Sequence, residues 1–369
     1  MQIECDVLVV GAGPAGLATA VLLSKKGFTS AVIEKGKSVG LHNIKYDITE
    51  GNIISGILKK LGIKPDKISE KSEWISPNHS FILESDIKDF YFKRGSEKNS
   101  LENKLVEKID KDITKIFLNS KINSYSLDKN GDVAKVEVIS PDGKKEFLPK
   151  YIVVADGSNS ELRKKLKIKT KIFATFRGLG ILAESKEDDI IPYAKIYFNK
   201  DLAPGGYIYT GSVGKDVFSC VVIDDFFSDV PLKRNLDTFF TEKFGDNLLI
   251  KGYFDGIGLS GVQDIISGNV MFIGGAALFH DPFLGYGLNY AIESAVVAVR
   301  AIEKEEEEIY IEYGKNLQKK FEEMKFAREM WRKADNNFFD ELIITLDGKN
   351  SYQYINAEIK TISKLLGIT

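Results

Sequence analysis

The chain has 369 residues and a nearly balanced charge, with 51 Lys and Arg against 53 Asp and Glu. This balance gives no net field that would recruit nucleic acid or an anionic membrane. Two cysteines without a CxxC spacing and three scattered histidines argue against a disulfide framework, an iron–sulfur cluster and a metal centre. No apolar run reaches the roughly 18 residues of a spanning helix, and the first residues do not resemble a signal peptide. We therefore expect a cytoplasmic protein that binds neither metal nor nucleic acid.

The N-terminal part of the chain follows the order of a dinucleotide-binding fingerprint: buried strand, glycine turn, helix, second strand and acidic residue. Gly11 permits the sharp turn, Gly13 leaves room for a pyrophosphate, and Gly16 lets helix and strand pack closely. The helix that begins at Pro14 turns its unpaired N–H groups and its positive dipole end toward the phosphates. Glu34 ends the second strand, where its carboxylate can accept the ribose hydroxyls of an adenosine. A glycine turn without a ligand explains this complete order poorly.

The rest of the chain alternates between two kinds of strand pattern. Buried strands return at residues 152–156 and 269–275, whereas residues 170–260 carry alternating aromatic strands typical of an antiparallel sheet. Residues 285–335 show helical periodicity, and we also expect a helix over residues 98–112. These patterns predict an α/β fold with a Rossmann-like nucleotide-binding domain, an inserted antiparallel β-sheet substrate domain and a small C-terminal helical region. The predicted limits are 1–72, 93–168 and 265–300 for the discontinuous first domain, 73–92 and 169–264 for the second, and 301–369 for the helical region.

Three separated segments should converge on one cofactor. The fingerprint is the first, and the second is residues 151–166, where Asp156 and Gly157 end a strand before a short helix. In the third segment, a strand ends in small residues, a proline-containing loop follows, and Gly285-x-Gly287 opens a long helix.

At these segments the chain resembles the FAD-dependent geranylgeranyl reductase family, within the wider group of flavoproteins shaped like p-hydroxybenzoate hydroxylase. The family segment ADG-x-x-S-x-x-R is similar to residues 155–163, and GDAAG-x-x-x-P-x-x-G-x-G is similar to residues 274–287. An arginine followed by a leucine-rich helix is matched by Arg94 and residues 101–105. The GGY-x-W-x-F-P motif of the reductases resembles GGYIYTG at residues 205–211.

The resemblance implies FAD as the cofactor, bound in an extended form beneath the antiparallel sheet. The third segment agrees with this, since a helix that begins near Gly287 can stabilise the charge that reduction places on the pyrimidine edge of a flavin. Pro282 would stiffen the preceding loop, although a buried helix entry with glycines for packing is the open alternative. The predicted cofactor-binding residues are Gly11, Gly13, Pro14, Ala15, Gly16, Glu34, Lys35, Arg94, Asp156, Gly157, Gly275, Pro282, Gly285, Gly287 and Leu288.

The chain departs from the family pattern at three places. Gly275 stands where the family usually carries an aspartate that holds a ribityl hydroxyl. This removes a charge-assisted hydrogen bond of about 1.5–3 kcal/mol, so we expect weaker FAD binding. Residues 41–45 lack the cysteine that the family has near the flavin, and Tyr209 replaces a tryptophan.

The leading functional prediction is a reductase that saturates C=C bonds of a polyprenyl lipid by hydride transfer from reduced flavin. His42, Tyr207 and Tyr209 are the candidate catalytic proton handlers, because the unperturbed pKa of a histidine side chain lies near neutrality and the tyrosines share one face of a strand. A surface histidine and core aromatics are the plainer alternatives. The substrate tunnel is expected to be lined by Phe218, Tyr207 and Phe283.

Two other functions stay open: an aromatic monooxygenase on the same fold, and a diverged FAD- or lipid-binding protein with little catalysis. The electron donor is unidentified, because a second Gly-x-Gly-x-x-Gly at residues 256–261 opens no helix and is interpreted as a crossover. A lipid substrate is compatible with peripheral membrane contact, although no basic amphipathic helix indicates it.

Overall fold

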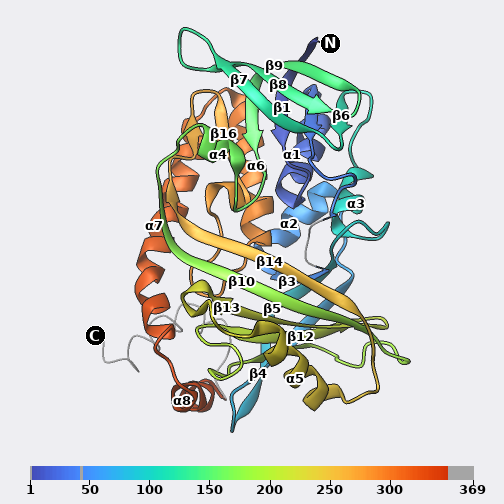
Figure 1. The fold of residues 1–369 in the computed structure, drawn as a ribbon, viewed down its shortest axis with the longest axis vertical. Helices are drawn as coiled ribbons and strands as arrows, with labels where there is room; N and C mark the ends of the chain where they lie inside the picture. The colour runs from blue at the N-terminus through green and yellow to red at the C-terminus, as the bar shows by residue number, and fades with distance from the viewer. Residues whose placement is uncertain (1, 42–44, 348–369) are drawn as a thin grey trace.

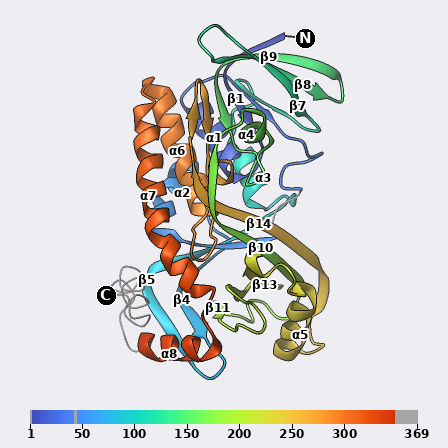
Figure 2. The ribbon, with the colours of Figure 1, turned by 60° about the vertical axis from the view of Figure 1, so that its left-hand side comes forward.

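The computed structural model of the chain describes residues 2–41 and 45–347, which form two sheets joined by two long strands (Figure 1). The first sheet lies in the upper part of that view and the second in the lower part. Helices α6 (Leu288–Lys304) and α7 (Glu308–Trp331) pack side by side along one edge, as Figure 2 shows. Among the described residues, no helix is long and apolar enough to cross a membrane.

The first sheet is built on the strand of the fingerprint. Its hydrogen-bonded order is β15-β16-β9-β1-β2-β6, with β8 paired to β9 and β7 paired to β8. β1 pairs in parallel with β2 and β9, and Val7, Leu8 and Val9 at its centre are fully buried, as is typical of a parallel strand covered on both faces. The strands are β1 (Gln2–Val10), β2 (Ser30–Ile33), β6 (Thr114–Phe117), β7 (Lys121–Leu127), β8 (Val133–Ser140), β9 (Gly143–Val154), β15 (Ile266–Ser267) and β16 (Val270–Phe272).

Short helices cover this sheet. α1 (Pro14–Lys25) starts from Gly13 as its N-cap and packs against α6. The others are α2 (Gly51–Leu61), α3 (Leu101–Val106), α4 (Glu161–Lys165) and the 3-10 turn η2 (Gly274–Ala277). The helix predicted over 98–112 is therefore too long, because the N–H groups of Lys108 and Ile109 bond to carbonyls three residues back and tighten the chain into a turn.

The second sheet has the order β14-β10-β13-β12-β11-β4-β5-β3. Its pairs are antiparallel except for β11 with β4. The strands are β3 (Tyr46–Glu50), β4 (Lys67–Ile75), β5 (Ser80–Lys93), β10 (Thr170–Glu184), β11 (Ala194–Tyr197), β12 (Tyr207–Val213), β13 (Asp216–Asp224) and β14 (Leu249–Gln263). β10 and β14 pair along nearly their whole length and connect this sheet to the first (Figure 1).

Helices cover the second sheet on two sides. The 3-10 turn η1 (Asp225–Phe227) and α5 (Leu232–Phe244) lie on one side, where Leu236, Phe239 and Phe240 pack on the buried face of the strands. α7 and α8 (Asn336–Leu346) build a second, aromatic core around Trp331 and Phe339. The α/β architecture expected from the sequence is confirmed by these two sheets and their helices.

One detail of the chain differs from the sequence-based picture. β3 and the start of β4 fall within residues 1–72, yet both pair into the second sheet, because β5 offers them one continuous antiparallel partner. The domain limits given above remain a proposal, with one change: β3 and the start of β4 are assigned to the second domain. Residues 256–261 lie within β14, where they pair with β10, and this strand leads back to β15 of the first sheet.

Candidate cofactor and substrate site

One large cavity of about 600 Å³ lies between the two sheets. Its volume falls within the range of small-molecule and cofactor sites. It extends from the glycine turn after β1 to the strands β12 and β13 of the second sheet. Among the predicted cofactor-binding residues, those that border it are Gly11, Gly13, Pro14, Ala15, Glu34, Lys35, Arg94, Asp156, Gly157, Gly275, Gly285, Gly287 and Leu288.

The glycine turn at one end of the cavity has the geometry of a phosphate cradle. Gly11 has a φ of +105°, and a Cβ there would lie 2.4 Å from the carbonyl oxygen of Ala155. A Cβ on Gly16 would lie 2.0 Å from the carbonyl oxygen of Gly11, so Gly16 serves the packing of α1 on β1 and does not border the cavity. Gly13 has open space where its Cβ would be, next to the start of α1. A pyrophosphate fits this space at the helix N-terminus.

Glu34 forms the next part of the cavity wall and holds the backbone on both sides of it. Its Oε2 accepts a hydrogen bond from the N–H of Ala12 at 2.8 Å, and its Oε1 accepts one from the N–H of Gly36 at 2.7 Å. Each carboxylate oxygen has a further lone pair, so the side chain can still accept ribose hydroxyls. Lys35 is exposed at the rim.

Asp156, after β9, carries a polar atom without a protein partner. Its Oδ2 accepts from the N–H of Glu161 at 2.9 Å, whereas its Oδ1 is buried and lacks any partner among the described residues. Gly157 beside it has a φ of +84° and open space at its Cβ position. Buried polar atoms are nearly always hydrogen-bonded in folded proteins. This unpaired oxygen therefore fits a ligand that carries hydroxyl groups, as FAD does.

Arg94 borders the cavity with its guanidinium held by two carboxylates. Its Nε donates to Glu102 at 2.8 Å, and its Nη1 donates to Asp47 at 2.7 Å. Arg94 and Glu102 are both buried, so the pair is shielded from water. The sequence predicted Arg94 but neither of the acids that position it.

The third segment brings the start of α6 to the cavity. α6 begins at Leu288 with Gly287 as its N-cap, as the sequence predicts. Gly285 has a φ of +82°, and a Cβ there would lie 2.9 Å from the ring of Phe176. Pro282 is buried in the preceding loop and does not border the cavity.

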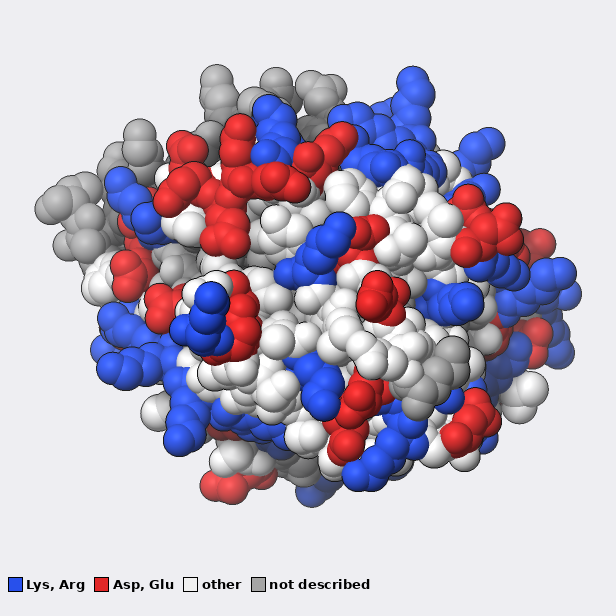
Figure 3. Space-filling model, turned by 90° about the horizontal axis from the view of Figure 1, so that it is seen from above, with Lys and Arg blue, Asp and Glu red and all other residues white. Residues whose placement is uncertain are grey.

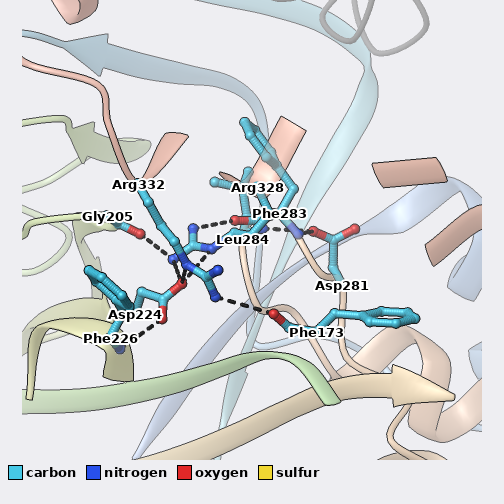
Figure 4. Close-up of polar contacts among 9 residues, drawn as sticks. All are labelled: Phe173, Gly205, Asp224, Phe226, Asp281, Phe283, Leu284, Arg328 and Arg332. Carbon is cyan, nitrogen blue, oxygen red and sulfur yellow. Dashed lines mark hydrogen bonds and ion pairs between the residues drawn. The ribbon is translucent and has the colours of Figure 1, made fainter. Parts of the chain in front are cut away.

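The loop at residues 281–285 is anchored by a buried charge network, shown in Figure 4. Arg328 on α7 is only 1% exposed; its Nε donates to Oδ2 of Asp224 at 2.8 Å and its Nη1 to the carbonyl oxygen of Phe283 at 3.0 Å. Its Nη2 donates to the same Asp224 oxygen and to the carbonyl of Gly205. Arg332 adds a second ion pair to Asp224 at 2.6 Å. Because these residues stand alone in the sequence without a motif, sequence reasoning missed the network.

Two effects oppose each other at Asp224. Burial raises its pKa, but the two arginines and the N–H of Phe226 together lower it by more, so the net pKa lies below the usual value. Asp281 completes the loop, because its Oδ1 accepts from the N–H groups of Phe283 at 2.9 Å and Leu284 at 2.7 Å. The loop is thus fixed from both sides.

The opposite end of the cavity is apolar and aromatic. Tyr207 and Tyr209 on β12 both border it, as predicted, and burial raises the pKa of each. The Tyr207 hydroxyl donates to the carbonyl oxygen of Leu284 at 2.8 Å. Cys220 is the register partner of Tyr209 on β13; its thiol donates to the carbonyl oxygen of Val221 at 3.7 Å, and burial raises the pKa of that thiol to about 12. The remaining apolar wall residues are Trp74, Phe176, Ile196, Phe198, Val222 and Leu284.

Two residues predicted to line the tunnel take other places. Phe218 and Phe283, expected to line the tunnel, lie behind its wall. Phe218 stacks on Tyr46 with ring centroids 4.6 Å apart, and Phe283 packs edge-on against Trp331. His42 lies outside the described residues.

Residues 4–199 match the model of the FAD binding domain family. This match covers more than half of the chain, so the chain belongs to the FAD binding domain family. It is a flavoprotein whose cofactor is FAD. The glycine cradle, the unpaired oxygen of Asp156 and the size of the cavity fit that cofactor.

The chain is similar in sequence to two reductases and one monooxygenase. The chain is 26% identical to digeranylgeranylglycerophospholipid reductase 3 of Methanosphaera stadtmanae, over 94% of this chain and 92% of the relative. It is 27% identical to the digeranylgeranylglycerophospholipid reductase of Thermoplasma volcanium, over 80% of this chain and 77% of the relative. A flavin-dependent monooxygenase of Legionella longbeachae is 25% identical over 80% of each chain.

Solved structures confirm the fold. A geranylgeranyl bacteriochlorophyll reductase-like protein of Thermoplasma acidophilum superposes with a TM-score of 0.84, covering 100% of this chain and 99% of that one at 22% identity. The p-nitrophenol 4-monooxygenase of Pseudomonas putida superposes with a TM-score of 0.72 at 18% identity, covering 94% and 98% of the two chains.

Proposed function

We propose that this FAD-dependent oxidoreductase saturates carbon–carbon double bonds of a polyprenyl lipid. The carrying observation is that one continuous cavity joins a phosphate cradle to an aromatic chamber suited to a hydrocarbon chain. The names of the relatives in Methanosphaera and Thermoplasma support a lipid with geranylgeranyl chains as the substrate. When bound, FAD supplies the hydride for this reaction.

The chain's own residues would prepare the chamber for this chemistry. Trp74, Phe198 and Val222 exclude water from the reacting bond, which protects a hydride donor from side reactions. Arg328 and Asp281 hold the loop at residues 281–285 in one position, so the wall between α6 and β12 stays fixed. The apolar wall also suits a hydrocarbon chain, which has no polar groups that need hydrogen bonds.

Among the proton handlers suggested by the sequence, we assign proton delivery to Tyr209. Burial raises its pKa, so the phenol carries its proton at neutral pH, and Tyr209 borders the apolar chamber where that proton is needed. The Tyr207 hydroxyl donates its hydrogen bond to the carbonyl oxygen of Leu284, so we assign Tyr207 to positioning the loop at residues 281–285. His42 stays a prediction.

The proposal includes an external electron donor and a transient contact with the membrane that holds the lipid. Residues 256–261 lie inside β14 and cannot form a second dinucleotide turn, which supports a separate reductant. Basic and acidic side chains are interspersed on the face seen in Figure 3, so electrostatic attraction to anionic lipid is not the expected mode of contact there.

Anaerobic turnover tests this proposal. The holoenzyme, reduced with dithionite, is incubated with a geranylgeranyl lipid without oxygen, and the products are analysed by mass spectrometry. We expect a product that gains two hydrogen atoms for each reduced bond. A lipid that stays unchanged with fully reduced enzyme would contradict the proposal.

A second candidate is flavin-dependent monooxygenation, which the relative in Legionella favours. This function predicts NAD(P)H oxidation that a phenolic substrate stimulates and that consumes oxygen. A preparation that cannot be reconstituted with flavin would instead favour a diverged lipid-binding protein.

A further inference from the structure

The imidazole of His280 occupies a space that three glycines leave open. A Cβ on Gly287, at the start of α6, would lie 2.5 Å from Nε2 of His280, and one on Gly258 of β14 would lie 2.9 Å from Cδ2. A Cβ on Gly275, in η2, would lie 3.2 Å from Cε1. The ring is therefore enclosed by three segments that are distant in sequence, and it fits there only because none of them carries a side chain.

This space is part of the cavity. His280 and its three glycine neighbours all border it. This part of the chain reaches both ends of the cavity, because a Cβ on Gly274 would lie 3.2 Å from Ala15 beside the phosphate cradle and one on Gly285 would lie 2.9 Å from Phe176 of the aromatic chamber. Since the ADP half of FAD belongs at the cradle and the substrate belongs in the chamber, the part of FAD between them is the flavin half, its ribityl chain and isoalloxazine ring.

The imidazole also has unused hydrogen-bonding capacity. Its Nδ1 is buried and has no partner among the described residues. Burial lowers the pKa of His280 to about 4, so the ring is neutral at physiological pH and carries one donor and one acceptor nitrogen. A backbone hydrogen bond with Leu259 acts on the pKa of the ring in the opposite direction to burial, so β14 holds the imidazole at the cavity wall.

We propose that His280 contacts the flavin half of FAD and occupies the place that a side chain at position 275 would otherwise take. Gly275 then does not leave a gap in the site. A side chain at 275 would begin 3.0 Å from the backbone N of Ser158 and 3.2 Å from Cε1 of His280, so it would have to share this room with the imidazole and with Ser158. This inference rests on FAD as the cofactor and names a residue that the fingerprint does not include.

Ligand titrations of the apoprotein separate this contact from a general effect on the fold. His280→Leu removes both nitrogens but keeps an apolar side chain, and binding of FAD and of ADP is measured by calorimetry. We expect the Kd for FAD to rise about two- to ten-fold, the loss of one hydrogen bond, while the Kd for ADP stays unchanged. His79→Gln, an exposed histidine outside the cavity, serves as the matched control and should change neither Kd.

A double-variant cycle tests the competition for space. Gly275→Asp and His280→Ala should each weaken FAD binding, whereas the combined variant should bind more tightly than the sum of the two losses predicts. An unchanged FAD Kd in His280→Leu would overturn the proposal, as would equal weakening of FAD and ADP. Failure of the unaltered protein to bind FAD would instead overturn the cofactor assignment itself.

Discussion

Replacing Arg328 on α7 by methionine should destabilise the protein more than most other single changes. The variant keeps most of the side-chain volume but removes the guanidinium that meets Asp224, Gly205 and Phe283. Asp224 is 1% exposed, so its carboxylate would remain as a buried charge with Arg332 as its remaining cation and the N–H of Phe226 as a neutral donor. Breaking a buried ion pair by removing one partner costs about 3–5 kcal/mol. That is a large part of the roughly 5–15 kcal/mol that stabilises a typical protein.

Urea unfolding of the holoenzyme, followed by tryptophan fluorescence, measures this loss. Arg332→Met is the matched control, because Arg332 is partly exposed and Arg328 remains, so we expect a loss of about 1 kcal/mol. Adding Asp224→Asn to Arg328→Met removes the uncompensated charge and should recover part of the stability. A loss below about 1 kcal/mol for Arg328→Met, or no recovery in the double variant, would refute the view that this network holds the loop.

Three further predictions concern the backbone turn, the proton donor and acid stability. Gly11→Ala should abolish FAD binding, because the new Cβ would clash with the carbonyl oxygen of Ala155. The control is Gly56→Ala in α2, where a Cβ has open space, and this variant should bind FAD normally when both are measured by calorimetry. Tyr209→Phe should lower kcat for prenyl reduction at least ten-fold with little change in FAD affinity, in the usual range for a lost general acid, and an unaltered kcat would reject the assignment. Because the folded-state pKa of Asp224 is lowered, its stabilising contribution is present above the unfolded-state pKa and is lost as pH falls through the folded-state value. The urea concentration at the unfolding midpoint should therefore fall as the pH is lowered from about 6 to 3, and it should fall less in Asp224→Asn than in the unaltered protein. An equal fall in both proteins would contradict this prediction.

The N-terminal half of the cofactor site could be predicted from the sequence because its parts are adjacent along the chain. The turn at Gly11, the helix at Pro14 and the acid at Glu34 lie within one strand–helix–strand unit, so their order alone fixes their geometry. The start of α6 at Leu288 was predictable for the same reason.

The network at Arg328 and the enclosure of His280 could not be predicted in this way. Each depends on segments that the topology brings together from β14, η2, α6 and α7, and the sequence shows no spacing that connects them. Gly275 illustrates the difference. Its missing side chain suggests a weaker site when only the motif is considered, but the structure places Ser158 and the imidazole of His280 within 3.2 Å of the position its Cβ would take.

The most direct test of the central claim is anaerobic reoxidation of the flavin by a prenyl lipid. The holoenzyme is reduced with dithionite, a geranylgeranyl lipid is added without oxygen, and the flavin absorbance is followed, with the fully saturated lipid as the control. We predict that absorbance of the oxidised flavin returns with the unsaturated lipid alone. Reoxidation that requires oxygen, or that proceeds equally with the saturated lipid, would contradict hydride transfer to a prenyl double bond in this cavity.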